Sequence, residues 1–193
     1  RYGEQKAVDS VSFSVGTGEI VGFIGPNGAG KSTTMKIITG TLLPDAGEVL
    51  IRDLPVSKNL KQIRRIIGYL PEHNPLYLEM YIREYLSHVD SLYSGRDHRK
   101  QRKERVERVI GMTGLGAEAR KRIGALSKGY RQRTCLPQTL LHDPEILLLD
   151  EPLGSRRSTL VALVGDLAIH SLYGAGFSDA GTICQVFFLI FSI

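Results

Sequence analysis

Residues 19–40 read EIVGFIGPNGAGKSTTMKIITG, and this stretch decides the fold. Its first part, residues 20–24, is an apolar run typical of a buried strand. Residues 25–32 then fit the pattern G-x-x-x-x-G-K-[ST], which defines a P-loop. A short helical stretch follows, and Gly40 is its stop signal. Strand, glycine loop and helix therefore occur in the order that a P-loop requires.

The chemistry of this loop predicts a nucleoside triphosphate site. Glycines allow the backbone to approach closely, and the amide groups form an anion nest at the N-terminus of a helix. We expect Lys31 to reach the β- and γ-phosphates and the Ser32 hydroxyl to ligate Mg²⁺. A glycine-rich turn that merely carries a lysine is disfavoured, because strand and helix both flank the loop. The predicted binding residues are Gly25, Pro26, Asn27, Gly28, Ala29, Gly30, Lys31, Ser32 and Thr33.

Length and charge leave the class of partner open. At 193 residues the chain suits one domain with a sizeable core. Its 25 basic and 20 acidic residues give a net charge of +5, which phosphate ligands alone partly explain. Two distant cysteines, Cys135 and Cys184, predict no disulfide framework and a reducing compartment. No run of about 18 apolar residues occurs, so we predict no membrane-spanning helix. Because the chain begins at Arg1, we expect its N-terminus to be incomplete.

Further strands are predicted on either side of the P-loop. Alternating apolar residues at 11–15 indicate a half-buried strand, and residues 48–51 and 66–70 indicate two more. Tyr2, ahead of the first of these, is placed to stack on a flat base, although an ordinary surface aromatic is as good an explanation. Glu72 follows residues 66–70, and ligands bind beyond the carboxyl ends of such strands. Glu72 is therefore a site candidate, with a plain connector as the alternative.

A helical insert is predicted over about residues 76–130. Apolar residues recur at helical spacing, and residues 96–108 are densely charged with i,i+4 partners. A nucleic-acid surface is one explanation for this charge, but a solvated helix face of mixed sign is the simpler one. Ser127 and Gly129 in LSKGYRQR then indicate a helix start that can hold an anion. Pro137 falls inside that helix, where it should cost about 3 kcal/mol for no reason visible in the sequence.

Two acids end the apolar strand predicted at residues 144–152, which read PEILLLDEP. Asp150 is placed to hold Mg²⁺ through water, and Glu151 to activate an attacking water as a general base. The alternative is an N-cap pair at a strand–loop junction. The P-loop upstream favours the catalytic interpretation.

Over residues 1–152 these motifs, in this order, resemble the ATP-binding domain of ABC transporters. The resemblance implies an α/β fold: a P-loop NTPase (RecA-like) core, a small antiparallel β lobe and an inserted helical subdomain. The sequence segments LPEHNPLY and LSKGYRQR most resemble those of ABC ATPases associated with gliding motility and their export-type relatives.

The resemblance also implies roles for single residues. Tyr2 matches the aromatic that stacks on adenine. Glu72 stands where the family usually carries a Gln that contacts Mg²⁺ and the membrane subunit. Ser127 and Gly129 match residues that face the γ-phosphate of a partner subunit.

By the same resemblance, ATP and Mg²⁺ are the expected cofactors. A homodimer would hydrolyse ATP and drive a transmembrane permease from the cytoplasmic face of the cell membrane, with no nucleic-acid partner. Two alternatives stay open: a soluble ABC ATPase outside transport, and a fragment that binds ATP without turnover.

Residues 153–193 depart from the family, which expects Ser-Gly-Leu-Asp and later a switch histidine. The sequence has Leu-Gly-Ser-Arg-Arg at 153–157, and His170 lies too close to Glu151 to be that histidine. Codon degeneracy permits this segment to be encoded as CTC GGG TCT CGA CGC, and a one-nucleotide shift of that DNA reads Ser-Gly-Leu-Asp. One hypothesis is thus a frameshifted tail; the other is a genuine tail that packs in an ordered way.

Overall fold

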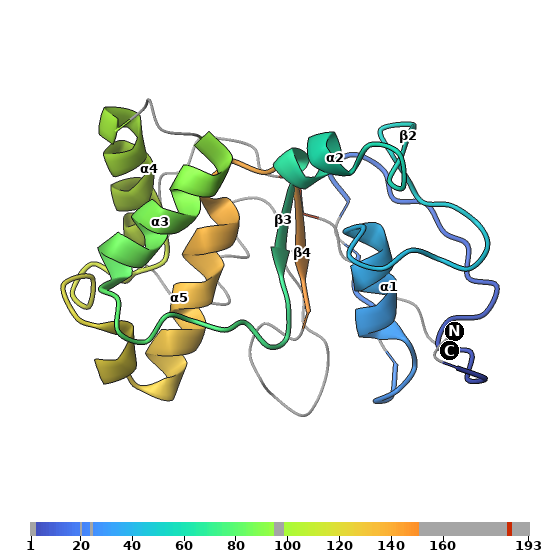
Figure 1. The fold of residues 1–193 in the computed structure, drawn as a ribbon, viewed down its shortest axis with the longest axis horizontal. Helices are drawn as coiled ribbons and strands as arrows, with labels where there is room; N and C mark the ends of the chain where they lie inside the picture. The colour runs from blue at the N-terminus through green and yellow to red at the C-terminus, as the bar shows by residue number, and fades with distance from the viewer. Residues whose placement is uncertain (1–2, 20, 24, 95–98, 151–184, 187–193) are drawn as a thin grey trace.

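A small parallel sheet lies between two groups of helices (Figure 1). The computed structural model describes residues 3–19, 21–23, 25–94, 99–150 and 185–186. On one side of the sheet lie α1 (Lys31–Ile38) and α2 (Leu60–Ile66). On the other lie α3 (Ile82–Ser94), α4 (Arg99–Met112) and α5 (Lys128–Leu140). The helix of the P-loop and the helices of the insert therefore sit on opposite faces.

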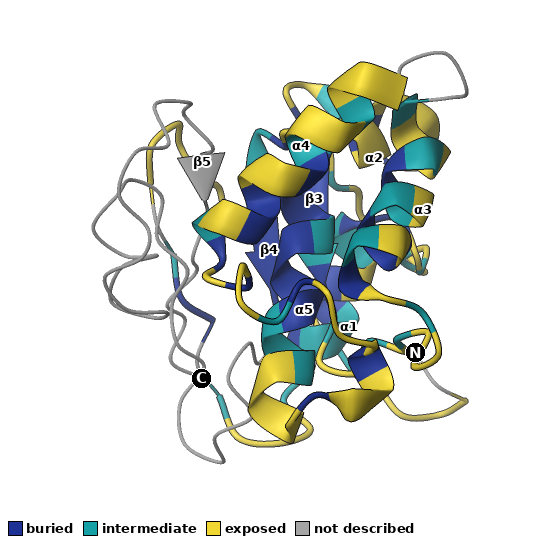
Figure 2. Ribbon diagram, turned by 90° about the vertical axis from the view of Figure 1, so that its left-hand side faces the viewer, coloured by how far each residue is buried: buried dark blue, intermediate teal, exposed yellow. Residues whose placement is uncertain are grey.

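The sheet is built around β3 (Ile67–Leu70) and β4 (Ile146–Leu149), which pair in parallel. At the other edge of β4, β5 (Gln185–Val186) also pairs in parallel. Both faces of β3 and β4 are covered by helices, so these strands are buried (Figure 2). This coverage explains why the two segments read as continuous apolar runs rather than alternating ones. The strands predicted at residues 66–70 and 144–152 are confirmed in part, as β3 and the shorter β4.

Side chains of β3 and β4 alternate between two apolar clusters. Ile67, Tyr69 and Leu148 belong to the cluster on the α1 side, which we call the nucleotide-side core. Leu70 and Leu147 belong to the larger cluster of the insert. Because side chains alternate along a strand, only every second residue of β3 and β4 lies on the face toward α1 and the P-loop.

The N-terminal segment corrects the sequence prediction. In the described part of the chain, neither residues 11–15 nor residues 21–23 form a strand. Phe13 and Val15 are half-buried and pack on the nucleotide-side core, where the rings of Phe13 and Phe23 lie 6.0 Å apart. The alternating apolar residues thus have one buried side, but no strand among the described residues pairs with this segment through ladder hydrogen bonds.

An antiparallel hairpin is formed by β1 (Leu50–Ile51) and β2 (Leu54–Pro55). Arg52 and Asp53 form its turn with φ of 51° and 59°. Positive φ at both central residues is the hallmark of the type I′ turn, whose twist matches that of the strands. The strand predicted at residues 48–51 is thus confirmed in part, as the short β1.

Within the predicted insert, the described residues form helices α3 and α4, and the 3₁₀ turn η1 (Ile123–Ala125) precedes α5. Pro137 lies in the interior of α5 and is fully buried. Burial of its ring offsets part of the lost backbone hydrogen bond. None of the helices in the described part of the chain is long and apolar enough to cross a membrane.

Candidate nucleotide site

The P-loop packs closely against the N-terminal segment. Gly30 precedes α1 with φ of +88°, and a Cβ there would lie 2.2 Å from the carbonyl oxygen of Ala7. Gly28 also has a positive φ, of +87°. Only glycine suits these conformations without strain. The first turn of α1 therefore opens directly onto the loop, as anion binding requires.

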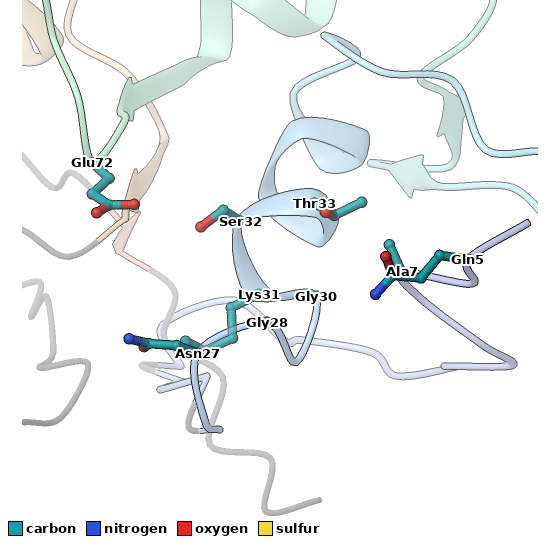
Figure 3. A pocket seen from close by; sticks show the side chains of 9 residues that line it. All are labelled: Gln5, Ala7, Asn27, Gly28, Gly30, Lys31, Ser32, Thr33 and Glu72. Carbon is teal, nitrogen blue, oxygen red and sulfur yellow. The ribbon is translucent and has the colours of Figure 1, made fainter. Parts of the chain in front are cut away.

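A pocket of about 420 Å³ lies at this loop (Figure 3). Glu72 marks one end of it, on the side of Ser32, and Gln5 lies at the other, beyond Thr33. Six of the nine predicted P-loop residues line this pocket, and Gly25, Pro26 and Ala29 do not. The lining residues are Gln5, Ala7, Asn27, Gly28, Gly30, Lys31, Ser32, Thr33 and Glu72.

Gln5 and Ala7 were not anticipated from the sequence. Their place in the pocket follows from the packing of Ala7 against Gly30, a contact between separate segments. No periodicity or motif in the first ten residues signals this contact.

The Lys31 ammonium is held by the loop itself. Its Nζ donates to the carbonyl oxygens of Gly25 at 2.6 Å and Pro26 at 2.9 Å. Lys31 is 9% exposed, so its charge acts where water screens it little. An ammonium has three donors, so phosphate oxygens can be bound here as point-charge partners.

Ser32 and Asp150 meet across 118 positions of sequence. The Ser32 Oγ donates to Asp150 Oδ1 at 3.1 Å. The Asp150 backbone N donates to Leu70 O at 2.8 Å, which ties the ends of β3 and β4 together. Because carboxyl ends of parallel strands meet at one edge, Asp150 and Glu72 both reach the P-loop. The two predicted metal ligands Ser32 and Asp150 thus lie side by side.

Burial raises the pKa of the Asp150 carboxyl above its usual range. The hydrogen bond from Ser32 lowers it, and the negative charge of Glu72 raises it further. A cation between these groups would relieve both the burial and the repulsion.

The donor set fits Mg²⁺. This ion takes oxygen ligands, keeps several waters and uses one or two carboxylates together with phosphates. Ser32 supplies a hydroxyl, and Asp150 and Glu72 supply carboxylates. No group of three or more His, Cys, Asp or Glu suited to a metal occurs within the described residues.

The signature segment lies away from this pocket. Ser127 caps α5 by accepting from the Tyr130 backbone N at 3.4 Å, as predicted. Ser127 and Gly129 are exposed and do not line the pocket. In Figure 1, β3 and β4 stand between α5 and α1. Within one chain, the P-loop and the signature segment do not form one site.

Two predicted site residues, Tyr2 and Glu151, lie outside the described residues. Their roles stay predictions.

Comparison with known families gives a match to the model described as ABC transporter, over residues 8–154. An uncharacterized ABC transporter ATP-binding protein of Bacillus subtilis is 40% identical over 154 residues, covering 80% of this chain and 50% of that protein. Nod factor export ATP-binding protein I of Rhizobium sp. is 37% identical, covering 78% and 49%. The bacitracin transport ATP-binding protein of Bacillus licheniformis is 38% identical, covering 78% and 48%. This chain therefore spans about half the length of these relatives.

Solved structures agree on the fold. An ATP-binding subunit of an ABC transporter aligns with TM-score 0.72 and 26% identity, over 97% of this chain and 74% of that one. A dimeric ATP-binding cassette in a post-hydrolysis state, bound to ADP and Pi, aligns with TM-score 0.69 and 29% identity, over 79% and 68%. The predicted α/β P-loop NTPase fold is confirmed. The finer resemblance to gliding-motility ATPases stays a prediction.

Proposed function

Because this chain belongs to the ABC transporter family of ATP-binding domains, we propose that it binds ATP with Mg²⁺ and hydrolyses it. The observation that carries this proposal is the 3.1 Å contact from Ser32 Oγ to Asp150 Oδ1. It places the end of the P-loop beside a buried acid at the end of β4. P-loop NTPases hold Mg²⁺ with the same two kinds of residue.

The pocket suggests how the nucleotide lies. Its phosphates follow the amides of the P-loop, with Lys31 against the β- and γ-phosphates. The γ-phosphate end lies toward Ser32 and Glu72, and the base lies toward Gln5, which is at the far end of the pocket. In this proposal Tyr2 stacks on the adenine. Mg²⁺, when bound, neutralises charge that develops on the phosphates.

Glu151 follows Asp150 directly, and we propose that it is the general base. Its carboxylate would accept a proton from the water that attacks the γ-phosphate. Buried Asp150 would stay with the metal.

A second copy completes the site in this proposal. Ser127 and Gly129 are exposed and separate from the pocket of their own chain, so only another chain can bring them to the γ-phosphate. The dimeric state of one solved neighbour supports this arrangement.

The names of the relatives, which mention export and transport, support a transmembrane permease as the further partner. The loop at Glu72 would face it, on the inner side of the cell membrane. Co-purification with permease subunits supports this proposal, whereas a chain that never associates with membranes favours a soluble ABC ATPase.

An ATPase assay on this chain tests turnover. We expect Mg²⁺-dependent hydrolysis that Glu151→Gln abolishes while ATP binding persists. Glu104→Gln, an exposed acid on α4, is the matched control and should leave the rate unchanged. ATP binding without turnover in the unmodified chain would favour the binding-only fragment. Absence of ATP binding would overturn the proposal itself.

For residues 153–193 we retain the proposal of an out-of-frame tail. The family match ends at residue 154, close to where the sequence departs from the expected Ser-Gly-Leu-Asp. Of this tail, only Gln185–Val186 lies within the described residues. The coding DNA tests the idea: codons for 153–157 that give no Ser-Gly-Leu-Asp in another frame rule it out.

A further inference from the structure

One buried hydroxyl on the α1 side of the sheet has no hydrogen-bond partner in the described structure. It is the hydroxyl of Tyr69, on β3. Leaving a buried hydroxyl unpaired is costly, and buried polar groups are paired in most proteins. We therefore ask whether this hydroxyl gains a hydrogen-bond partner when the ligand binds.

The strand geometry places this hydroxyl near Asp150. Tyr69 pairs in register with Leu148, and Asp150 follows the last residue of β4, two positions after Leu148. Side chains two apart on a strand share a face, so Tyr69, Leu148 and Asp150 lie on the same side of the sheet. That side faces α1, because Tyr69 and Leu148 pack with Met35 in the nucleotide-side core.

Electrostatics agree with this placement. Burial raises the pKa of Tyr69 to about 12, and the negative charge of Asp150 contributes in the same direction. The phenol therefore stays protonated at neutral pH and remains a hydrogen-bond donor. A carboxylate is an acceptor only, so the two groups are complementary.

Asp150 has capacity for this donor. Its Oδ1 accepts from Ser32, while an ionised carboxylate offers about four lone-pair sites on two oxygens. Metal ligands usually need such outer partners to fix their orientation, and losing one typically weakens metal binding about 10–100-fold.

We propose that Tyr69 is a positioning residue for the magnesium site, whose hydroxyl donates to the Asp150 carboxylate when that carboxylate turns toward Mg²⁺. The inference rests on the proposed function, since it requires Mg²⁺ to bind with ATP at Ser32 and Asp150. Tyr69 itself touches neither the phosphates nor the metal. It acts by holding the acid in one orientation.

The test is a Mg²⁺ titration of the binding of a fluorescent ATP analogue, on the full chain and on Tyr69→Phe. We expect Tyr69→Phe to need about tenfold more Mg²⁺ for half-saturation. Binding of the analogue in EDTA should match the unmodified chain, and this also reports that the variant is folded. If Tyr69 has a purely structural role, Tyr69→Phe should weaken binding of the analogue both with Mg²⁺ and in EDTA.

Two further variants complete the design. Tyr85→Phe is the matched control, because Tyr85 is buried in the insert and its hydroxyl donates to Gln138 far from the pocket. Its Mg²⁺ titration should be unchanged. In an Asp150→Asn background, adding Tyr69→Phe should cause no further loss, because the acceptor charge has gone.

The outcomes separate the two proposals. Failure of the unmodified chain to show Mg²⁺-dependent binding overturns the proposed function, and this inference with it. An intact response in the unmodified chain with an identical titration for Tyr69→Phe overturns this inference alone. Additive losses in the Asp150→Asn background also overturn it.

Discussion

A buried acid of the helical insert and two polar groups of the nucleotide half differ in how their hydrogen-bonding capacity is used. In the insert, Asp90 is 1% exposed and fully paired: Arg105 donates to it at 2.6 and 2.8 Å and Ser94 at 2.7 Å. In the nucleotide half, the Lys31 ammonium donates to two carbonyls of its own loop, and the Tyr69 hydroxyl has no partner among the described residues.

This difference separates stability from function. A buried charge that is satisfied within the chain fixes the packing of α3 on α4 and has nothing left to offer a ligand. The Lys31 ammonium and the Tyr69 hydroxyl, by contrast, keep hydrogen-bonding capacity for a ligand. We therefore expect substitutions in the insert to change the free energy of unfolding, and substitutions near the P-loop to change binding.

Asp90→Asn should have the largest effect on stability. Removing one partner of a buried ion pair leaves the other uncompensated, which costs about 3–5 kcal/mol. We expect the lower end of that range, because Arg102 and Arg105 are partly exposed and can reach water. Urea unfolding measures the change, and Glu104→Gln on the solvated face of α4 is the control. A loss below about 1 kcal/mol would contradict the contrast between the two halves.

The same pair predicts a pH dependence. Burial alone would raise the pKa of Asp90, but hydrogen bonds from Arg105 and Ser94 outweigh it, and the pKa lies below its ordinary value. A lowered pKa contributes stability above the unfolded value of about 4, and this contribution is lost as pH falls through the folded pKa. The gap in unfolding free energy between the unmodified chain and Asp90→Asn should therefore shrink below about pH 4. A constant gap from pH 7 to pH 3 would argue against this pairing.

Lys31→Ala should act on binding instead. Hydrogen bonds to charged groups contribute about 1.5–3 kcal/mol, so ATP affinity should fall about 10–100-fold. The melting temperature should barely move, because the lost partners are loop carbonyls. Titration of a fluorescent ATP analogue measures the affinity, with exposed Lys61→Ala on α2 as the control. A large drop in melting temperature with unchanged ATP affinity would show that Lys31 stabilises the fold and does not bind the nucleotide.

Gly68→Ala tests how the two halves are joined. A Cβ at Gly68 would lie 2.5 Å from Thr139 O and 2.9 Å from Pro144 Cγ, so β3 would be pushed away from α5. Overpacking of this kind costs about 1–3 kcal/mol. Gly111→Ala, with open space around it in α4, should instead gain about 0.5–1 kcal/mol. Thermal unfolding of the two variants shows whether each substitution stabilises or destabilises the chain. Equal effects would show that β3 has room for a Cβ at Gly68.

Much of the site was predictable because its chemistry is encoded in short segments. The P-loop, Ser32 and Asp150 each sit in a local pattern, and the meeting of parallel strand ends then brings them together. The helical insert was predictable for a similar reason, since its apolar spacing runs over several turns.

What the sequence did not reveal depends on contacts between distant segments. Gln5 enters the pocket because Ala7 packs on Gly30, and the orphaned hydroxyl of Tyr69 depends on how β3 lies beside β4. The strand predicted at residues 11–15 was wrong for a related reason. Alternating burial shows that one face is covered, but it does not show that a neighbouring strand is present to pair with.

The smallest expected effect comes from comparing two tyrosines, one in each half. Tyr85→Phe removes a hydroxyl that donates to Gln138 in the insert, so it should cost about 0.5–1.5 kcal/mol. Tyr69→Phe removes an unpaired hydroxyl, so without ligand it should leave the unfolding free energy unchanged or raise it slightly. Urea unfolding of both variants in EDTA measures the difference. With Mg²⁺ and ATP, Tyr69→Phe should become the less stable of the two variants. Ligand binding stabilises the folded chain by mass action, and Tyr69→Phe binds the metal more weakly. Without ligand, Tyr69→Phe could instead lower the free energy of unfolding as much as Tyr85→Phe does. That result would show that the Tyr69 hydroxyl is paired within the chain, and the contrast between the two halves would fail at this position.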